Sequence, residues 1–148
     1  MCKLTLLTIA AVLGLGAEPR VFDAKIEKIY RIRLDKGDLL LESLIAVIQK
    51  EGIQDGTLLS AAGSLSECTF HGVGGKKTTV KEDMEINHLG GIIANGEPHF
   101  HVSLSTAEKG GFGGHLENDC RVLSHVEVSI AKLSGPALAR KKGLLDVK

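Results

Sequence analysis

Apolar and polar residues alternate along several stretches of the chain, and this period of two predicts half-buried β-strands. The first stretch runs from Lys25 to Leu34, where mostly charged residues separate Ile26, Tyr30 and Ile32. Four later stretches have a similar strand-like pattern: 57–70, 84–94, 99–106 and 122–130. The pattern therefore predicts strands over much of the chain.

One stretch has helical spacing instead. Between Leu39 and Glu51 the apolar residues recur three and four positions apart, at Leu41, Leu44, Ile45 and Ile48. Asp38 precedes them as a candidate N-cap, and Gly52 follows them as a candidate C′ residue. We therefore expect an amphipathic helix over Leu39–Glu51 that starts from an Asp38 cap and stops at Gly52.

Small residues mark the turns and close approaches. The run Ser60–Ser64 lies in a strand-like stretch, which indicates that a backbone, ligand or neighbouring subunit approaches there. Gly90 and Gly91 interrupt another stretch and predict a bulge. Asn95-Gly96 is a strong tight-turn signal. From Ser134 onward the sequence is typical of an exit segment and tail.

Length and composition favour one domain without a large basic face. The chain has 148 residues, of which 43% are hydrophobic, and it contains four Phe, one Tyr and no Trp. Eighteen basic and eighteen acidic residues give a formal net charge of zero. Nucleic-acid binding needs a concentrated basic surface, so we expect no direct binding of nucleic acid.

The first seventeen residues resemble a secretory signal peptide. Lys3 is followed by an apolar run from Leu4 to Ala17, and Glu18 begins a polar stretch. The run is shorter than the ~20 residues of a transmembrane helix, so we expect no stable membrane span. Residues 1–17 are therefore predicted to direct export to the periplasm or outside the cell. The alternative is an N-terminal core element of a cytoplasmic protein.

Two cysteines remain if this peptide is removed. Cys2 would leave with it, and Cys68 and Cys120 would stay in the domain. In an oxidising compartment they could pair, although their separation in space is not evident from the sequence. They lie in apolar stretches, so the other interpretation is that they pack as free thiols.

Three histidines form the candidate metal site. His99 and His101 are two apart, which puts both imidazoles on one face of a strand. His115 follows Gly110–Gly114, a run that permits a tight return towards the pair. Three neutral nitrogen ligands with an open position are typical of zinc, and other divalent transition metals accept them too. The alternative is three ordinary histidines of a strand and a loop.

Several ordered motifs resemble the PPC (plants and prokaryotes conserved) domain, in its stand-alone prokaryotic form. They are Arg31-x-Arg33-Leu34-x-x-Gly37-Asp38-Leu39-Leu40-x-Glu42-Ser43-Leu44, Gly63-Ser64-Leu65, Glu85-Ile86, Gly96-x-Pro98-His99-x-His101-Val102-Ser103-Leu104 and Gly113-Gly114-His115-Leu116. The resemblance covers about residues 25–133 and leaves 134–148 as a C-terminal tail. It departs from the common prokaryotic pattern at Asn87-His88, where His88 adds an imidazole of unknown role.

The resemblance implies an α/β (α+β) fold, a largely antiparallel sheet with flanking helices, that assembles as a homotrimer. It also implies that His99, His101 and His115 hold a metal. In plants the domain follows an AT-hook, a short Arg-Gly-Arg-Pro segment that binds DNA. This sequence contains no such segment, so the DNA-binding role does not carry over.

Three functions remain open at this point. The first is a metal-binding module with a binding or assembly role and an unidentified small-molecule ligand. The second is a zinc-dependent hydrolase or lyase that uses metal-bound water, with Glu97, Glu85, or Glu127 together with His125 as candidate acids or bases. The third is a DNA-associated module, which the neutral charge and missing AT-hook disfavour.

Overall fold

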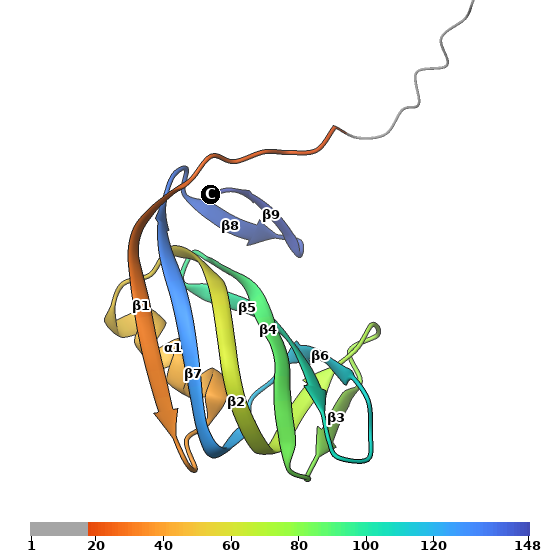
Figure 1. Cartoon of the computed structure of the whole chain (residues 1–148). Coiled ribbons are helices and arrows are strands. Elements are labelled where there is room, and N and C mark those ends of the chain that lie inside the picture. The colour runs from red at the N-terminus through yellow and green to blue at the C-terminus, as the bar shows by residue number, and fades with distance from the viewer. Residues whose placement is uncertain (1–17) are drawn as a thin grey trace, which may run out of the picture.

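The computed structural model describes residues 18–148, and in it the chain forms a curved antiparallel sheet with one helix against it (Figure 1). The first half contains β1 (Lys25–Asp35), α1 (Leu40–Lys50), β2 (Asp55–His71), β3 (Lys77–Val80) and β4 (Met84–Ala94). The second half contains β5 (Glu97–Ser105), β6 (Phe112–Leu116), β7 (Arg121–Ser134), β8 (Leu138–Lys141) and β9 (Leu144–Val147). The predicted signal peptide, residues 1–17, lies outside the described residues.

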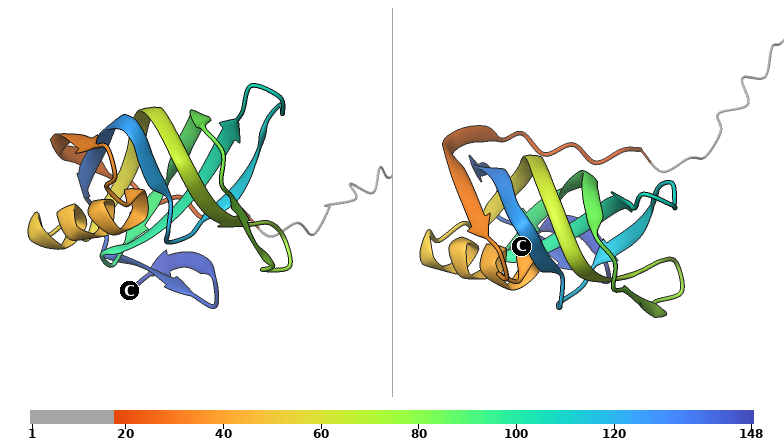
Figure 2. Two further views of the ribbon diagram at one scale, coloured as in Figure 1. Left: turned by 90° about the horizontal axis from the view of Figure 1, so that it is seen from below. Right: turned by 60° about the horizontal axis from the view of Figure 1, so that its bottom comes forward.

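The main sheet has seven strands, and β2 is its central element. The strand order is β1-β7-β2-β4-β5-β6, with β3 paired to β2. The far end of β2 also pairs with β6, so that β6 lies between β5 and β2. This second pairing requires the sheet to curl, and the curl is visible in both views of Figure 2. The predicted antiparallel sheet is confirmed, with a single helix among residues 18–148.

The core lies between the concave face of the sheet and α1. Alternation along β5 turns one set of side chains inward, and Phe100, Val102 and Leu104 are all buried. The helix contributes Leu40, Leu44 and Ile48 at a spacing of four, each at most 1% exposed. The opposite face of β5 is free to carry polar groups.

The helix agrees with the prediction to within one residue at each end, but its cap does not. Gly52 has the expected positive φ of 61° after the last turn. Leu39 occupies the N-cap position, without a side-chain hydrogen bond. The Asp38 carboxylate instead accepts a hydrogen bond from the backbone N–H of Asp35, 2.9 Å away. The prediction that Asp38 caps the helix was therefore wrong. Asp38 closes the turn after β1, and the N-cap position falls one residue later, at Leu39.

The predicted bulge lies a few residues before the glycines. The register between β4 and β5 shifts between Ile86 and His88, whereas Gly90 and Gly91 pair regularly with His101 and Phe100. A Cβ at Gly91 would collide with the backbone carbonyl of His99. The glycine there permits close strand approach, which sequence alone does not distinguish from a bulge.

The segment from Ser134 onward, expected as a tail, contains more structure than that. Residues 138–147 form the hairpin β8–β9, a separate two-stranded sheet beside the N-terminal ends of β1 and β2 in Figure 1. Arg140 donates a hydrogen bond to the carbonyl of Gly143 across its turn, 2.7 Å away. Within residues 18–148, no helix has the length and apolar character needed to cross a membrane.

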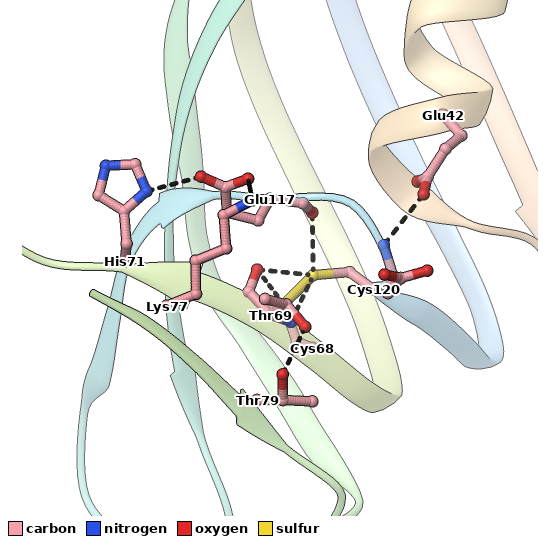
Figure 3. A network of polar contacts seen from close by, with 9 residues as sticks. Glu42, Cys68, Thr69, His71, Lys77, Thr79, Glu117 and Cys120 are labelled. Carbon is pink, nitrogen blue, oxygen red and sulfur yellow. Dashed lines mark hydrogen bonds and ion pairs between the residues drawn. A yellow bond between two sulfur atoms is a disulfide. The ribbon is translucent and has the colours of Figure 1, made fainter. Parts of the chain in front are cut away.

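Cys68 and Cys120 form a disulfide, so the pairing interpretation holds and the free-thiol one does not (Figure 3). Cys68 is in β2 and Cys120 immediately precedes β7. Both side chains are fully buried, and the backbone N–H of Thr69 donates to the Cys120 sulfur at 3.2 Å. The bond therefore links the centre of the sheet to the segment that follows β6.

Candidate metal centre

The outward face of β5 carries the first two histidines. Because Phe100 and Val102 face the core, His99 and His101 face outward, and His101 is exposed while His99 is half-buried. The β4 partners of this pair are Ile92 and Gly90, and the imidazole of His88 lies over Gly90 beside His101. The predicted common face of the two imidazoles is confirmed.

Two glycines allow β6 to fit between its neighbours. His115 pairs with His101 on β5 and, on the other side, with His71 on β2. A Cβ at Gly113 would collide with the carbonyl of Val102 on β5, and one at Gly114 with the carbonyl of His71 on β2. Glycine at both positions is therefore what lets three strands come together at this point. The sequence predicted that His115 would come back towards His99 and His101. It does so because β5 and β6 pair as a hairpin.

The three imidazoles converge. One ring nitrogen of each of His99, His101 and His115 lies within 4.8 Å of the others, and the two Nε2 atoms of His99 and His101 are 3.2 Å apart. Three nitrogens bound at about 2.0–2.1 Å to a tetrahedral zinc would be separated by roughly 3.3 Å. The first pair already has that spacing, and the nitrogen of His115, within 4.8 Å of both, would have to move closer by at most about 1.5 Å. The residues present therefore fit a three-histidine metal site.

Burial favours the neutral form of two of the triad histidines. Desolvation lowers the pKa of His99, and the positive charge of Arg140 on β8 lowers it further. Desolvation is also the main cause that lowers the pKa of His115, followed by the charge of neighbouring His71. Metal ligation requires neutral imidazole, so these shifts favour the ligating form at neutral pH.

A fourth histidine and a glutamate stand beside the triad, and the sequence analysis missed both. His71, the last residue of β2, stacks on His115 with ring centroids 4.6 Å apart. Its Nδ1 lies 2.7 Å from Oε1 of Glu117 (Figure 3). The other oxygen of Glu117, Oε2, forms an ion pair with Nζ of Lys77 at 2.6 Å. These hydrogen bonds, first that from Lys77, lower the pKa of Glu117. Only the β2–β6 pairing brings His71 here, and no local motif indicates it.

The triad and His71 line one shallow depression. The loop Gly72–Gly75 forms the wall on its other side, and the depression has a volume of about 550 Å³. It is open to solvent rather than enclosed, as expected for a site on the outer face of a sheet. Apart from Val73, all the residues that line it are histidine or glycine. A small ligand could therefore reach a metal there without a conformational change.

None of the acidic residues expected from the sequence lines this depression. Glu97 is exposed at the start of β5, and Glu85 is exposed at the start of β4. Glu127 is on β7, in a separate depression with Arg31 and Arg33. Its neighbour on that strand, His125, contacts Ser124 and not the triad.

The imidazole of His88 lies over Gly90 on β4, because a Cβ at Gly90 would be 2.5 Å from its Nε2. It is outside the depression that contains the triad. The structure thus places this extra histidine near the site without making it part of it.

The family can now be stated. The family model of the Plants and Prokaryotes Conserved (PCC) domain matches residues 22–134. The chain belongs to this family, whose name is also abbreviated PPC. The match covers the sheet, the helix and all three triad histidines, and it ends before the β8–β9 hairpin.

Among curated proteins, the chain resembles part of a much longer one. It is 30% identical over 115 residues to the bifunctional protein GlmU of Synechococcus sp. (strain JA-2-3B'a(2-13)). The match covers 77% of this chain and 18% of that protein. The chain therefore spans less than a fifth of the length of this relative.

Solved structures share the fold. A PPC protein of Pyrococcus horikoshii is 27% identical, with a TM-score of 0.68 over 89% of this chain and 97% of that one. A structure described as a metal-containing protein of Archaeoglobus fulgidus is 26% identical, with a TM-score of 0.68 over 84% and 94%. A Bacteroides thetaiotaomicron protein whose name proposes DNA binding is 21% identical, with a TM-score of 0.70 over 87% and 98%. At 21% identity, the likeness to the Bacteroides protein shows a common fold and no more. The name of that protein does not support the expectation that this chain binds no nucleic acid.

Proposed function

We propose that this protein is a metal-binding PPC module in which His99, His101 and His115 hold one zinc ion per chain. The convergence of one nitrogen from each ring to within 4.8 Å carries the proposal. The donor set supports zinc, because three imidazoles with an open position are typical of that ion. The name of the Archaeoglobus fulgidus relative, which includes the word metal, also supports a bound metal.

The open depression favours a binding or assembly role over turnover. A zinc hydrolase or lyase needs a general acid or base near metal-bound water. Glu97, Glu85 and Glu127 lie outside the depression, and Glu117 is already engaged by His71 and Lys77, so turnover would have to rely on His71 as the base. The metal would then present one coordination position to a small ligand or to a side chain of a partner.

The family resemblance suggests a homotrimer, and the surface offers a place for subunit contact. Ile26, Ile29 and Leu59 are exposed apolar residues, 59%, 51% and 48% accessible, on strands β1 and β2. The small residues Ser60–Ala62 line a depression of about 430 Å³ on the outside of β1, β7 and β2. A neighbouring subunit that covered these features would bury apolar surface now in contact with water.

We also propose export, and the disulfide supports it. Buried disulfides persist in oxidising compartments and are rare in cytosolic proteins. Cys68–Cys120 is such a bond, and the predicted signal peptide would deliver the chain to a compartment where it forms. A protein isolated from its own host should then begin near Glu18, as intact mass would reveal; a species retaining Met1 would contradict export.

Elemental analysis combined with native mass spectrometry tests the central proposal. We expect about one zinc per chain, a mass three times that of the monomer, and loss of the metal in His101→Ala. His125→Ala is the matched control, because His125 lies on β7 away from the triad and should leave the metal in place. Full zinc content in His101→Ala, or no metal in the wild type, would contradict the proposal.

We retain the expectation of weak binding to duplex DNA. Eighteen acidic side chains balance the eighteen basic ones, so the net attraction for the phosphate backbone should be small. Fluorescence anisotropy with a random duplex at physiological salt should show no sub-micromolar binding. Tight binding that weakens steeply with added salt would show that the PPC surface itself recognises DNA.

A further inference from the structure

His71 occupies a defined place relative to the triad. His101, His115 and His71 are directly opposed residues on three adjacent strands, β5, β6 and β2, so their imidazoles form a row across the outer face. The ring of His71 stacks on His115, with an interplanar angle of 34°. Its nitrogens are not part of the group that converges within 4.8 Å. His71 is therefore beside the metal position, on the floor of the same depression.

Glu117 fixes which nitrogen of His71 carries the proton. Both oxygens of Glu117 are engaged from outside: Lys77 Nζ lies 2.6 Å from Oε2, and the His71 ring turns its Nδ1 towards Oε1. Nδ1 of His71 is 2.7 Å from this carboxylate, so Nδ1–H is the donor. In the neutral ring the lone pair is then on Nε2, the nitrogen of His71 in Figure 3 that makes no contact with Glu117.

The disulfide holds this arrangement in place. Cys68 is three residues before His71 on β2, and Cys120 is three residues after Glu117. The covalent bond therefore joins the two backbone segments that carry the histidine and its carboxylate partner, as Figure 3 shows. Such support is expected for a side chain whose orientation matters, and a merely solvated histidine would not need it.

We propose that His71 is a positioning residue that accepts a hydrogen bond, through Nε2, from a protic oxygen ligand bound to the triad's metal. The ligand class is small oxygen donors that retain a hydrogen-bond donor when coordinated, such as water, alcohols and hydroxamic acids. The inference rests on the proposed function, because it needs a metal on the triad. It adds selectivity: the open coordination position prefers a protic ligand to an aprotic anion of similar size.

The test uses cobalt(II) in place of zinc, because the visible absorption of cobalt reports ligand binding. Two oxygen-donor probes are compared, each between wild type and variant: acetohydroxamic acid keeps an N–H donor when its oxygens coordinate, and acetate has none. The variants are His71→Phe, which keeps an aromatic ring against His115, and Glu117→Leu, which removes the acceptor for Nδ1–H. Glu117→Gln keeps an acceptor oxygen for Nδ1–H but turns an NH2 group towards Lys77, so it should weaken acetohydroxamic acid binding less than Glu117→Leu does. His125→Ala, on β7 and outside the depression, is the control.

We expect every variant to retain about one cobalt per chain and a native circular dichroism spectrum. His71→Phe and Glu117→Leu should bind acetohydroxamic acid about threefold to tenfold more weakly, the equivalent of one lost hydrogen bond, while acetate affinity stays within twofold. Equal weakening of both probes, or of neither, would overturn the role of His71. Loss of cobalt in His71→Phe would make His71 a metal ligand and also overturn it. A wild-type protein that binds no cobalt would refute the proposed metal centre itself. Measuring the metal content distinguishes this outcome from the outcomes that concern only His71.

Discussion

The substitution Gly114→Ala should separate the metal site from the rest of the fold. A Cβ at this position would lie 2.9 Å from the carbonyl carbon of His71 and nearer still to its oxygen. Ordinary Cβ contacts begin near 3.4 Å, so β6 and β2 must move apart by at least about 0.5 Å. Metal–ligand distances tolerate only about 0.2 Å. Because His115 is the next residue, its imidazole must turn away from its preferred position to keep the bond to the metal, and this weakens binding.

The expected magnitudes follow from this displacement. Forcing a methyl group into close-packed surroundings costs about 1–3 kcal/mol of unfolding free energy. Zinc affinity should fall by at least about tenfold, as for other disturbances of the residues that orient metal ligands. Isothermal titration calorimetry measures the affinity, and denaturant unfolding followed by circular dichroism measures the stability.

Gly110→Ala is the matched control. A Cβ at Gly110 would have nothing within 4 Å, and the position is in the loop between β5 and β6, four residues before Gly114. The control should retain wild-type zinc affinity and stability. If Gly114→Ala bound zinc as tightly as Gly110→Ala and unfolded at the same denaturant concentration, then β6 would not depend on the glycine for its close fit against β2.

Three further predictions concern the disulfide, a buried acid and pH. Reduction of Cys68–Cys120, which are 52 residues apart, should lower the unfolding free energy by about 4 kcal/mol, as denaturant curves with and without dithiothreitol would show; coincident curves would refute this. Burial raises the pKa of Asp55 above 3.8, and its Oδ1 is buried without a hydrogen-bond partner. The ionised form of Asp55 therefore destabilises the folded protein, and the unfolding free energy falls as pH rises through the folded-state pKa. Asp55→Asn should therefore raise the melting temperature at pH 7 and leave it unchanged near pH 3; a lower value at pH 7 would count against this. Metal should be retained at pH 7 and released only below pH 6.5, because the pKa values of His99 and His115 are lowered from 6.5 and only neutral imidazole binds a metal. Dialysis at stepped pH followed by elemental analysis measures the release. Release of the metal above pH 7 would contradict this prediction.

Local pattern was enough to predict most of the strands, the helix and the triad. His99 and His101 could be assigned to one face from their spacing alone, and Gly113 and Gly114 indicated a return of His115. These inferences need only the period of a strand and the conformational freedom of glycine. The three ligands could be predicted because they lie within one hairpin.

The rest of the site depends on which strands pair over long distances. His71 is 44 positions before His115, and they meet only because β2 curves far enough to pair with β6. No local motif carries that register, so His71 and its partner Glu117 were missed. The Asp38 cap failed for a different reason: an aspartate before a helix can satisfy the preceding turn instead, and the two uses look the same in sequence.

The two faces of β5 have consequences for how such a protein can change over evolutionary time. The histidines point outward, while Phe100, Val102 and Leu104 on the same strand build the core. A mutation that removes a ligand therefore leaves the packing that specifies the fold almost untouched. A lineage could lose the metal, acquire another ion, or convert the depression to a new contact surface by a few outward substitutions, with little penalty in stability. The packing of the fold and the outward-facing candidate ligands can therefore change separately.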